Sequence, residues 1–207
     1  FKSKKKFRWY YMSQLVLRFY TSVILLVIIA SSLNYLPIMF SLLILICTLS
    51  LNEFNNLFRK IYKKKNFLYL ISIIISLFYL LFFSLTISNY ILPFDDSLKI
   101  SLIFLIFICV LTDMGGYFFD KIFGGRKFTK ISPNKTYSGM IGGYFLSLIS
   151  LSFFMNWINY AVDVEWFIVT ILISTASQIG DIIISYFKRL SKIKDTGKII
   201  PGHGGLL

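Results

Sequence analysis

The sequence predicts an all-α, polytopic integral membrane protein with about six transmembrane helices. Hydrophobic residues make up 57% of its 207 residues and charged residues only 15%, and the mean hydropathy is +0.74. These values exclude an ordinary soluble domain. The apolar residues fall in runs of about 20, the length that a helix needs to cross roughly 30 Å of hydrocarbon.

The six predicted spans are, in order, 15–33, 36–52, 67–88, 98–120, 139–157 and 164–187. The basic opening F-K-S-K-K-K-F-R resembles the start of a signal peptide. The apolar stretch behind it is long and has no small-residue cleavage site, so we interpret it as a retained first span. A first residue of Phe1 rather than Met indicates trimming or processing at this end.

The distribution of charge predicts the orientation. Of the 22 Lys and Arg residues, 21 lie at the opening of span one or follow spans two, four and six. The positive-inside rule then places both termini and the functional loops in the cytoplasm, which indicates a plasma (inner) membrane protein. Basic loops beside an anionic leaflet explain the net charge of +13, and no nucleic-acid-binding module accompanies them, so nucleic acid is not an expected partner.

Glycine divides the chain, because all 12 glycines lie at or beyond Gly115. Tight turns, close approach of backbones and phosphate-binding loops depend on glycine. We therefore predict a transmembrane scaffold over residues 1–110, which holds spans one to three and the start of span four, and a membrane region that carries the functional site over residues 111–207.

Three acids lie within or at the end of predicted helices in the second region. An ionisable residue inside a span is costly and indicates a functional site. At 1.5 Å per residue, Asp113 and Asp181 should both lie about 10 Å below the cytoplasmic end of their spans, where they could share one pocket. For Asp120 we prefer a solvated helix end.

Span six carries a polar stripe at helical spacing, formed by Ser177, Asp181, Ser185 and Lys188. Such a stripe inside a span predicts an aqueous cavity. For Ser177 and Gln178, hydrogen bonding between helices is an equally good explanation.

The loop before span five ends in Lys135 and Thr136. A helix start offers free N–H groups and a positive dipole end, which suit a phosphate. The alternative is a helix cap followed by packing of the small residues in G-x-x-G-G, and both explanations can hold together. No Walker-type motif is present.

Residues 185–205 follow the pattern S-x-F-K-R-x4-K-D-x-G-x3-P-G-H-G-G. This pattern resembles the signature of the bacterial-type phosphatidate cytidylyltransferases, also called CDP-diglyceride synthases. Three upstream segments resemble other motifs of that family: D-M-G-G-Y at 113–117, I-S-P-N-K-T at 131–136 and S-Q-I-G-D at 177–181. The resemblance covers roughly residues 110–207.

The resemblance implies transfer of CMP from CTP to phosphatidic acid, giving CDP-diacylglycerol and pyrophosphate in phospholipid biosynthesis. It implies a Mg²⁺ site, with Asp181 as the first choice of ligand and Asp113 as the second; a second cation and a homodimer stay open. The remaining implied site residues would hold phosphates, donate hydrogen bonds or form a tight nucleotide-binding loop. They are Lys135, Lys188, Arg189 and Lys194 for phosphates, Ser132 and Thr136 as donors, Asp195 to orient Lys194 or the loop, and Gly202, His203, Gly204 and Gly205 in the loop.

Two departures from the family pattern bear on the site. Ser138 stands where the family commonly has an acid. The chain ends at Leu207, where the family's D-R-x-D segment should begin, so we expect a truncated chain that lacks its closing helices and part of its metal site. An inactive chain is one expected consequence.

Two other functions stay open at this point. A cytidylyltransferase acting on another lipid phosphate, such as an isoprenoid-ether lipid, would share every motif above. An ion-coupled transporter would also use acids inside spans, but transporters commonly show an internal repeat, and the one-sided glycine distribution argues against one.

Overall fold

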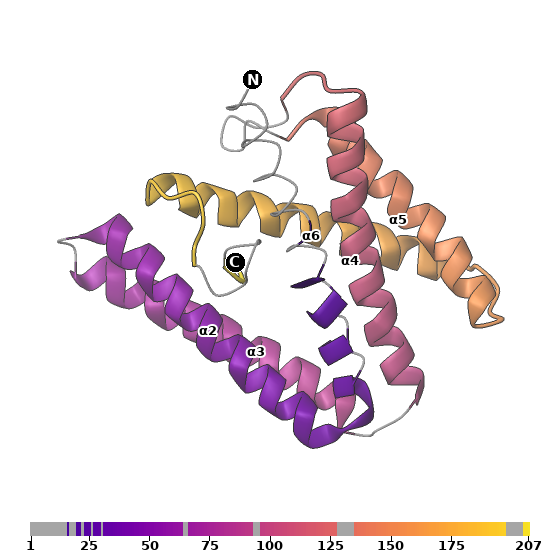
Figure 1. Cartoon of the computed structure of the whole chain (residues 1–207), viewed down its shortest axis with the longest axis horizontal. Helices are drawn as coiled ribbons and strands as arrows, with labels where there is room; N and C mark the ends of the chain where they lie inside the picture. Colours follow the sequence, from indigo (N-terminus) through magenta and orange to yellow (C-terminus); the bar gives the residue numbers. More distant parts are fainter. Residues whose placement is uncertain are drawn as a thin grey trace. The chain divides into compact units, whose positions relative to one another are not determined.

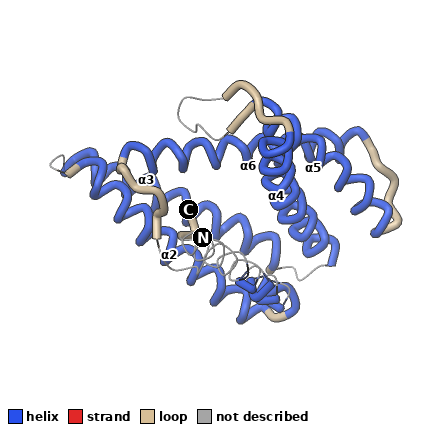
Figure 2. The backbone as a smooth tube through the Cα atoms, turned by 45° about the horizontal axis from the view of Figure 1, so that its top comes forward, coloured by secondary structure: helices blue, strands red, loops and turns tan. Residues whose placement is uncertain are grey.

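The computed structural model describes residues 16, 20–21, 23–25, 27–29, 31–63, 66–92, 96–127, 135–197 and 205–207. This part of the chain contains five long helices and no strand (Figures 1 and 2). The helices are α2 (Leu36–Tyr62), α3 (Asn66–Ile91), α4 (Asp96–Ile122), α5 (Tyr137–Trp157) and α6 (Val164–Leu190).

All five helices are long and apolar enough to cross a membrane. The prediction of an all-α polytopic membrane protein is therefore confirmed, and five of the six predicted spans correspond to α2–α6. The first predicted span, 15–33, is described only in part, at residues 16, 20–21, 23–25, 27–29 and 31–33, and a shorter apolar helix is found at Val23–Asn34.

Helix α2 differs most from its prediction, because it ends at Tyr62 rather than near residue 52. The continuous apolar run stops near residue 52, but buried residues continue beyond it at helical spacing as Phe54, Leu57 and Phe58. An amphipathic stripe of this kind keeps a helix packed beyond its purely apolar part.

The chain divides into two compact units. One comprises Phe1–Phe94 together with Leu190–Leu207, and the other comprises Asp95–Arg189. The predicted functional division after residue 110 stays a prediction.

In the first unit, α2 and α3 pack side by side (Figure 1). The Tyr69 hydroxyl of α3 donates a hydrogen bond to the Asn55 side-chain oxygen of α2. Leu43, Leu57 and Leu80 are buried in this unit.

In the second unit, α4 and α5 approach closely at their glycines. A Cβ added to Gly115 would lie 2.3 Å from the carbonyl oxygen of Gly142, so the contact has no room for a side chain. The predicted packing of small residues is confirmed here. Farther along the same two helices, Phe104, Ile108 and Met155 form a buried apolar core, which holds the pair together away from the polar end.

Candidate active site

A cavity of about 550 Å³ lies among α4, α5 and α6 in the second unit. Acidic, basic and neutral polar side chains line it: Asp113, Asp120 and Asp181, Lys121 and Lys135, and Thr112, Thr136 and Gln178. The prediction of an aqueous cavity beside span six agrees with this geometry.

Asp113 comes from α4 and Asp181 from α6, and both side chains line this cavity. The shared pocket expected for these two acids is therefore present in the structure. Their role as metal ligands stays a prediction.

Lys135 reaches from the start of α5 to the carboxylate of Asp181, with its Nζ 2.5 Å from Oδ2. The Lys135 side chain is 30% exposed and that of Asp181 is 51% exposed. Solvent screens a pair of this exposure, so the pair contributes little to stability. The ammonium group of Lys135 neutralises the carboxylate of Asp181 within the cavity.

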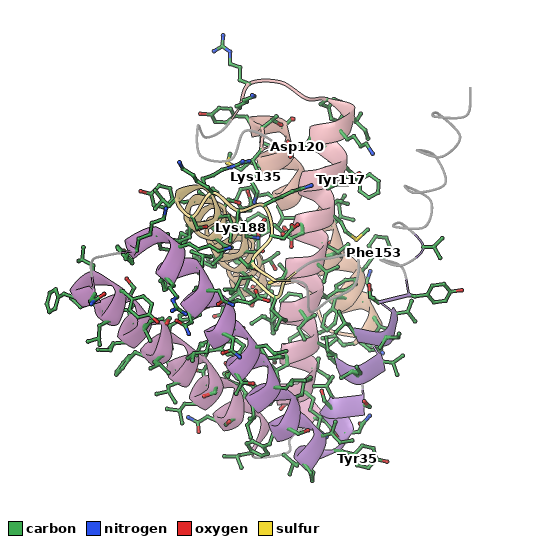
Figure 3. All side chains as sticks on the ribbon, turned by 60° about the vertical axis from the view of Figure 1, so that its left-hand side comes forward. Tyr35, Tyr117, Asp120, Lys135, Phe153 and Lys188 are labelled. Carbon is green, nitrogen blue, oxygen red and sulfur yellow. The ribbon has the colours of Figure 1, made fainter. Side chains whose placement is uncertain are left out.

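Asp120 anchors the start of α5, so the interpretation of a solvated helix end was wrong. Its Oδ1 accepts a hydrogen bond from the backbone N–H of Thr136 at 3.0 Å and another from the Thr136 hydroxyl. The Thr136 side chain also accepts from the Gly139 N–H and caps α5. Figure 3 shows Asp120 and Lys135 near the same end of α4. The helix end was misinterpreted because the contact joins residues 16 positions apart.

The two ends of the α4–α5 connection are themselves held together. Lys127 and Thr136 form an antiparallel bridge, and the Tyr137 N–H donates to the Arg126 carbonyl at 3.1 Å. The Ser138 hydroxyl donates to the Gly124 carbonyl. Ser138, the departure from the family pattern, thus takes part in closing this connection.

Polar contacts at and near the cavity wall link α6 to the other two helices. The Thr112 hydroxyl of α4 donates to the Ser174 hydroxyl of α6 at 3.0 Å, and the Tyr144 hydroxyl of α5 lies 2.9 Å from that of Thr175. Gln178 lines the cavity, and its amide nitrogen lies 3.5 Å from the Met140 carbonyl. Gln178 therefore fits both explanations that its sequence position left open.

The other predicted site residues are distributed as follows. Lys188 and Arg189 lie in the last turn of α6 and do not line this cavity; Lys188 is labelled in Figure 3. Lys194, Asp195 and Gly205 belong to the first unit. Ser132, Gly202, His203 and Gly204 lie outside the described residues. The roles of all of these stay predictions.

Sequence reasoning assigned no role to two residues of the cavity wall, Tyr117 and Lys121. The Lys121 Nζ donates to the Tyr117 hydroxyl at 2.9 Å and lies 5.1 Å from the centre of its ring. Their spacing of four residues on one helix was the available signal. They bring a second cation to the cavity wall beside Lys135.

Sequence reasoning also missed Glu53 of α2. Its side chain is 2% exposed, and its carboxylate accepts hydrogen bonds from the C-terminal segment of the first unit. It follows the apolar run of span two directly, just beyond the predicted end of that span.

The donor set of the cavity fits a magnesium ion. Within the described ranges, no group of three or more His, Cys, Asp or Glu side chains is arranged to hold a metal. Mg²⁺ does not need such a group, because it commonly binds one or two carboxylates together with water and substrate phosphates. Asp113 and Asp181 supply two carboxylates that face one cavity.

Comparison with known proteins gives one family. The model of a group described as "Cytidylyltransferase family" matches residues 2–207. Three relatives carry the name phosphatidate cytidylyltransferase. The protein of Staphylococcus aureus strain COL is 45% identical over 100 residues, which are 47% of this chain and 38% of the relative. That of Staphylococcus saprophyticus is 40% identical over 109 residues, 51% of this chain and 42% of the relative.

The third relative, from Staphylococcus haemolyticus, is 43% identical over 100 residues, 47% of this chain and 38% of the relative. In all three, the matched region spans less than half of the relative's own length.

Proposed function

Because this chain belongs to the cytidylyltransferase family, we propose that the protein transfers CMP from CTP to phosphatidic acid and releases pyrophosphate. The observation that carries the proposal is the cavity among three membrane-spanning helices, in which Asp113, Asp181 and Lys135 face one space. The relatives named phosphatidate cytidylyltransferase support the choice of lipid substrate.

In this reaction a phosphate oxygen of the lipid attacks the α-phosphorus of CTP. A new P–O bond forms, the bond between the α-phosphorus and the bridging oxygen breaks, and pyrophosphate leaves with that oxygen. Such a displacement needs little covalent help from the protein and much neutralisation of charge. Lys135 and Lys121 on the cavity wall supply positive charge for the phosphate oxygens.

Asp113 and Asp181 would hold Mg²⁺. When bound, the ion would neutralise phosphate charge and orient the triphosphate. The chain's own contribution is to place two carboxylates from different helices beside one cavity and to keep a lysine within reach of both ligands and substrate.

The Lys135–Asp181 ion pair would separate when substrate binds, and each side chain would then take a new partner. Without substrate, each group neutralises the other at 2.5 Å. A triphosphate offers Lys135 a stronger set of acceptors, and its accompanying cation offers Asp181 a replacement for the ammonium group. Because the pair is exposed and contributes little to stability, the exchange costs the fold little.

The location inside a helix bundle suits two substrates of different solubility. A lipid headgroup can enter the cavity from the bilayer, and a nucleotide can enter from the aqueous side. Because the positive-inside rule assigns the basic loops to the cytoplasm, the proposed site faces the cytoplasmic side of the plasma (inner) membrane.

The test uses the full-length protein purified in detergent. Pyrophosphate release is measured with CTP, Mg²⁺ and phosphatidic acid, and each component is omitted in turn. Formation of a CDP-lipid that requires all three supports the proposal. Release with an isoprenoid-ether lipid phosphate but not with phosphatidic acid would reassign the substrate, and no release with any lipid phosphate would refute the proposal.

A further inference from the structure

The first unit contains a buried carboxylate that the proposed chemistry does not use. Glu53 lies on α2 and is 2% exposed. Burying a carboxylate in a membrane-spanning helix is costly unless hydrogen bonds satisfy its oxygens. An apolar side chain at this position would avoid that cost, so the partners of Glu53 indicate what the carboxylate does.

Within the described ranges, the donors to Glu53 are three residues of the C-terminal segment. The Thr196 hydroxyl lies 2.6 Å from Oε2. The Leu206 N–H lies 2.9 Å from Oε1 and 3.0 Å from Oε2, and the Leu207 N–H lies 3.0 Å from Oε2. One carboxylate thus binds residues on both sides of the segment 197–205.

Two glycines allow this approach. A Cβ added to Gly205 would lie 2.5 Å from Oε2 of Glu53, and one added to Gly197 would lie 2.6 Å from Oε1. Neither position has room for a side chain beside the carboxylate. Gly197 and Gly205 therefore allow the C-terminal segment to pack directly against the carboxylate of Glu53.

We propose that Glu53 is a positioning residue that ties together Thr196 and residues 206–207, and so fixes where the intervening glycine-rich segment begins and ends. The inference rests on the proposed function, because that segment includes Gly202, His203 and Gly204, which the family resemblance assigns to nucleotide binding. Glu53 bonds to the residues that flank the segment, so it would act on the substrate only through the segment. Its loss should therefore weaken use of CTP and leave use of the lipid nearly unchanged.

The test compares wild-type full-length protein with Glu53→Gln, which has the same shape but replaces one acceptor oxygen with an NH₂ donor facing the backbone N–H groups. Hydrogen exchange followed by mass spectrometry reports protection of the Leu206 and Leu207 amides. Pyrophosphate release reports KM and kcat for each substrate. The matched control is Glu165→Gln, an exposed glutamate at the start of α6.

We expect faster exchange at residues 206–207 and a fall of about tenfold or more in kcat/KM for CTP in Glu53→Gln, mainly through KM. The KM for phosphatidic acid should change less than about twofold, and Glu165→Gln should match the wild type in every measurement. Unchanged exchange and an unchanged KM for CTP would overturn the inference. Equal losses for both substrates would also overturn it, because they indicate a general effect on folding.

The exchange measurement separates this inference from the proposed function. If the wild-type protein shows no cytidylyl transfer, the proposed function fails, and amide protection at residues 206–207 still tests the contacts of Glu53. If Glu53→Gln does not fold, Thr196→Val removes one donor and leaves the carboxylate with its two backbone partners. This variant should show a smaller rise in exchange and a rise of a few-fold in KM for CTP; no change in either would overturn the inference.

Discussion

Removal of the Asp120 carboxylate should loosen the start of α5. Asp120→Ala eliminates the acceptor for the Thr136 N–H at 3.0 Å and for the Thr136 hydroxyl. A hydrogen bond to a charged group contributes about 1.5–3 kcal/mol, so two bonds at the lower end of that range give about 3 kcal/mol. Asp120→Asn keeps one acceptor oxygen and should cost about half as much.

The assay is thermal unfolding of the full-length protein in detergent, followed by pyrophosphate release on the folded protein. For a chain of this size, about 3 kcal/mol corresponds to a fall of about 6 °C or more in Tm. The rate should fall as well, because Lys135 directly precedes Thr136 and depends on the same anchor.

The control is Asp96→Ala on the same helix. Asp96 is 88% exposed and forms an ion pair with Lys99, three residues away, at 2.9 Å, so its loss should cost less than about 1 kcal/mol. If Asp120→Ala lowers Tm no more than Asp96→Ala, the reasoning that Asp120 anchors α5 is refuted.

Three further predictions follow from the second unit. Lys135→Met should leave Tm within about 2 °C, since its ion pair with Asp181 is exposed, while pyrophosphate release falls about 100-fold or more; equal loss of stability and activity would contradict this. Gly115→Ala should lower Tm clearly, because its Cβ would lie 2.3 Å from the Gly142 carbonyl oxygen, whereas Gly116→Ala has 3.7 Å of space and should be tolerated; similar Tm values for the two variants would contradict the close helix contact. EDTA should abolish pyrophosphate release, and added Mg²⁺ should restore it; full activity in EDTA would exclude the proposed cation.

The sequence was sufficient to predict the membrane-spanning helices, because a helix that crosses hydrocarbon needs a run of apolar residues that can be counted directly. An apolar run does not show where a helix ends when an amphipathic stripe continues beyond it. Phe54, Leu57 and Phe58 extend α2 through an amphipathic stripe, and Glu53 lies where the apolar run gives way to that stripe.

Two features of the sequence predicted residues of the candidate site: the high free-energy cost of an acid inside a span, and the helical spacing of polar residues along span six. Asp113 and Asp181 were singled out because acids inside spans are expensive, and both line one cavity in the structure. Contacts between distant residues could not be predicted this way. The link from Asp120 to Thr136 crosses 16 positions, and the link from Glu53 to Thr196 crosses 143; neither leaves a local pattern in the sequence.

Cytidylyl transfer is proposed to depend on Asp181 and the cavity that it lines. The most direct measurement is pyrophosphate release by full-length Asp181→Asn, compared with Asp96→Asn, which makes the same chemical change at a carboxylate that is 88% exposed on α4. We predict that Asp181→Asn loses about 100-fold or more of the wild-type rate with an unchanged Tm, and that Asp96→Asn keeps it. Wild-type activity in Asp181→Asn would contradict the account.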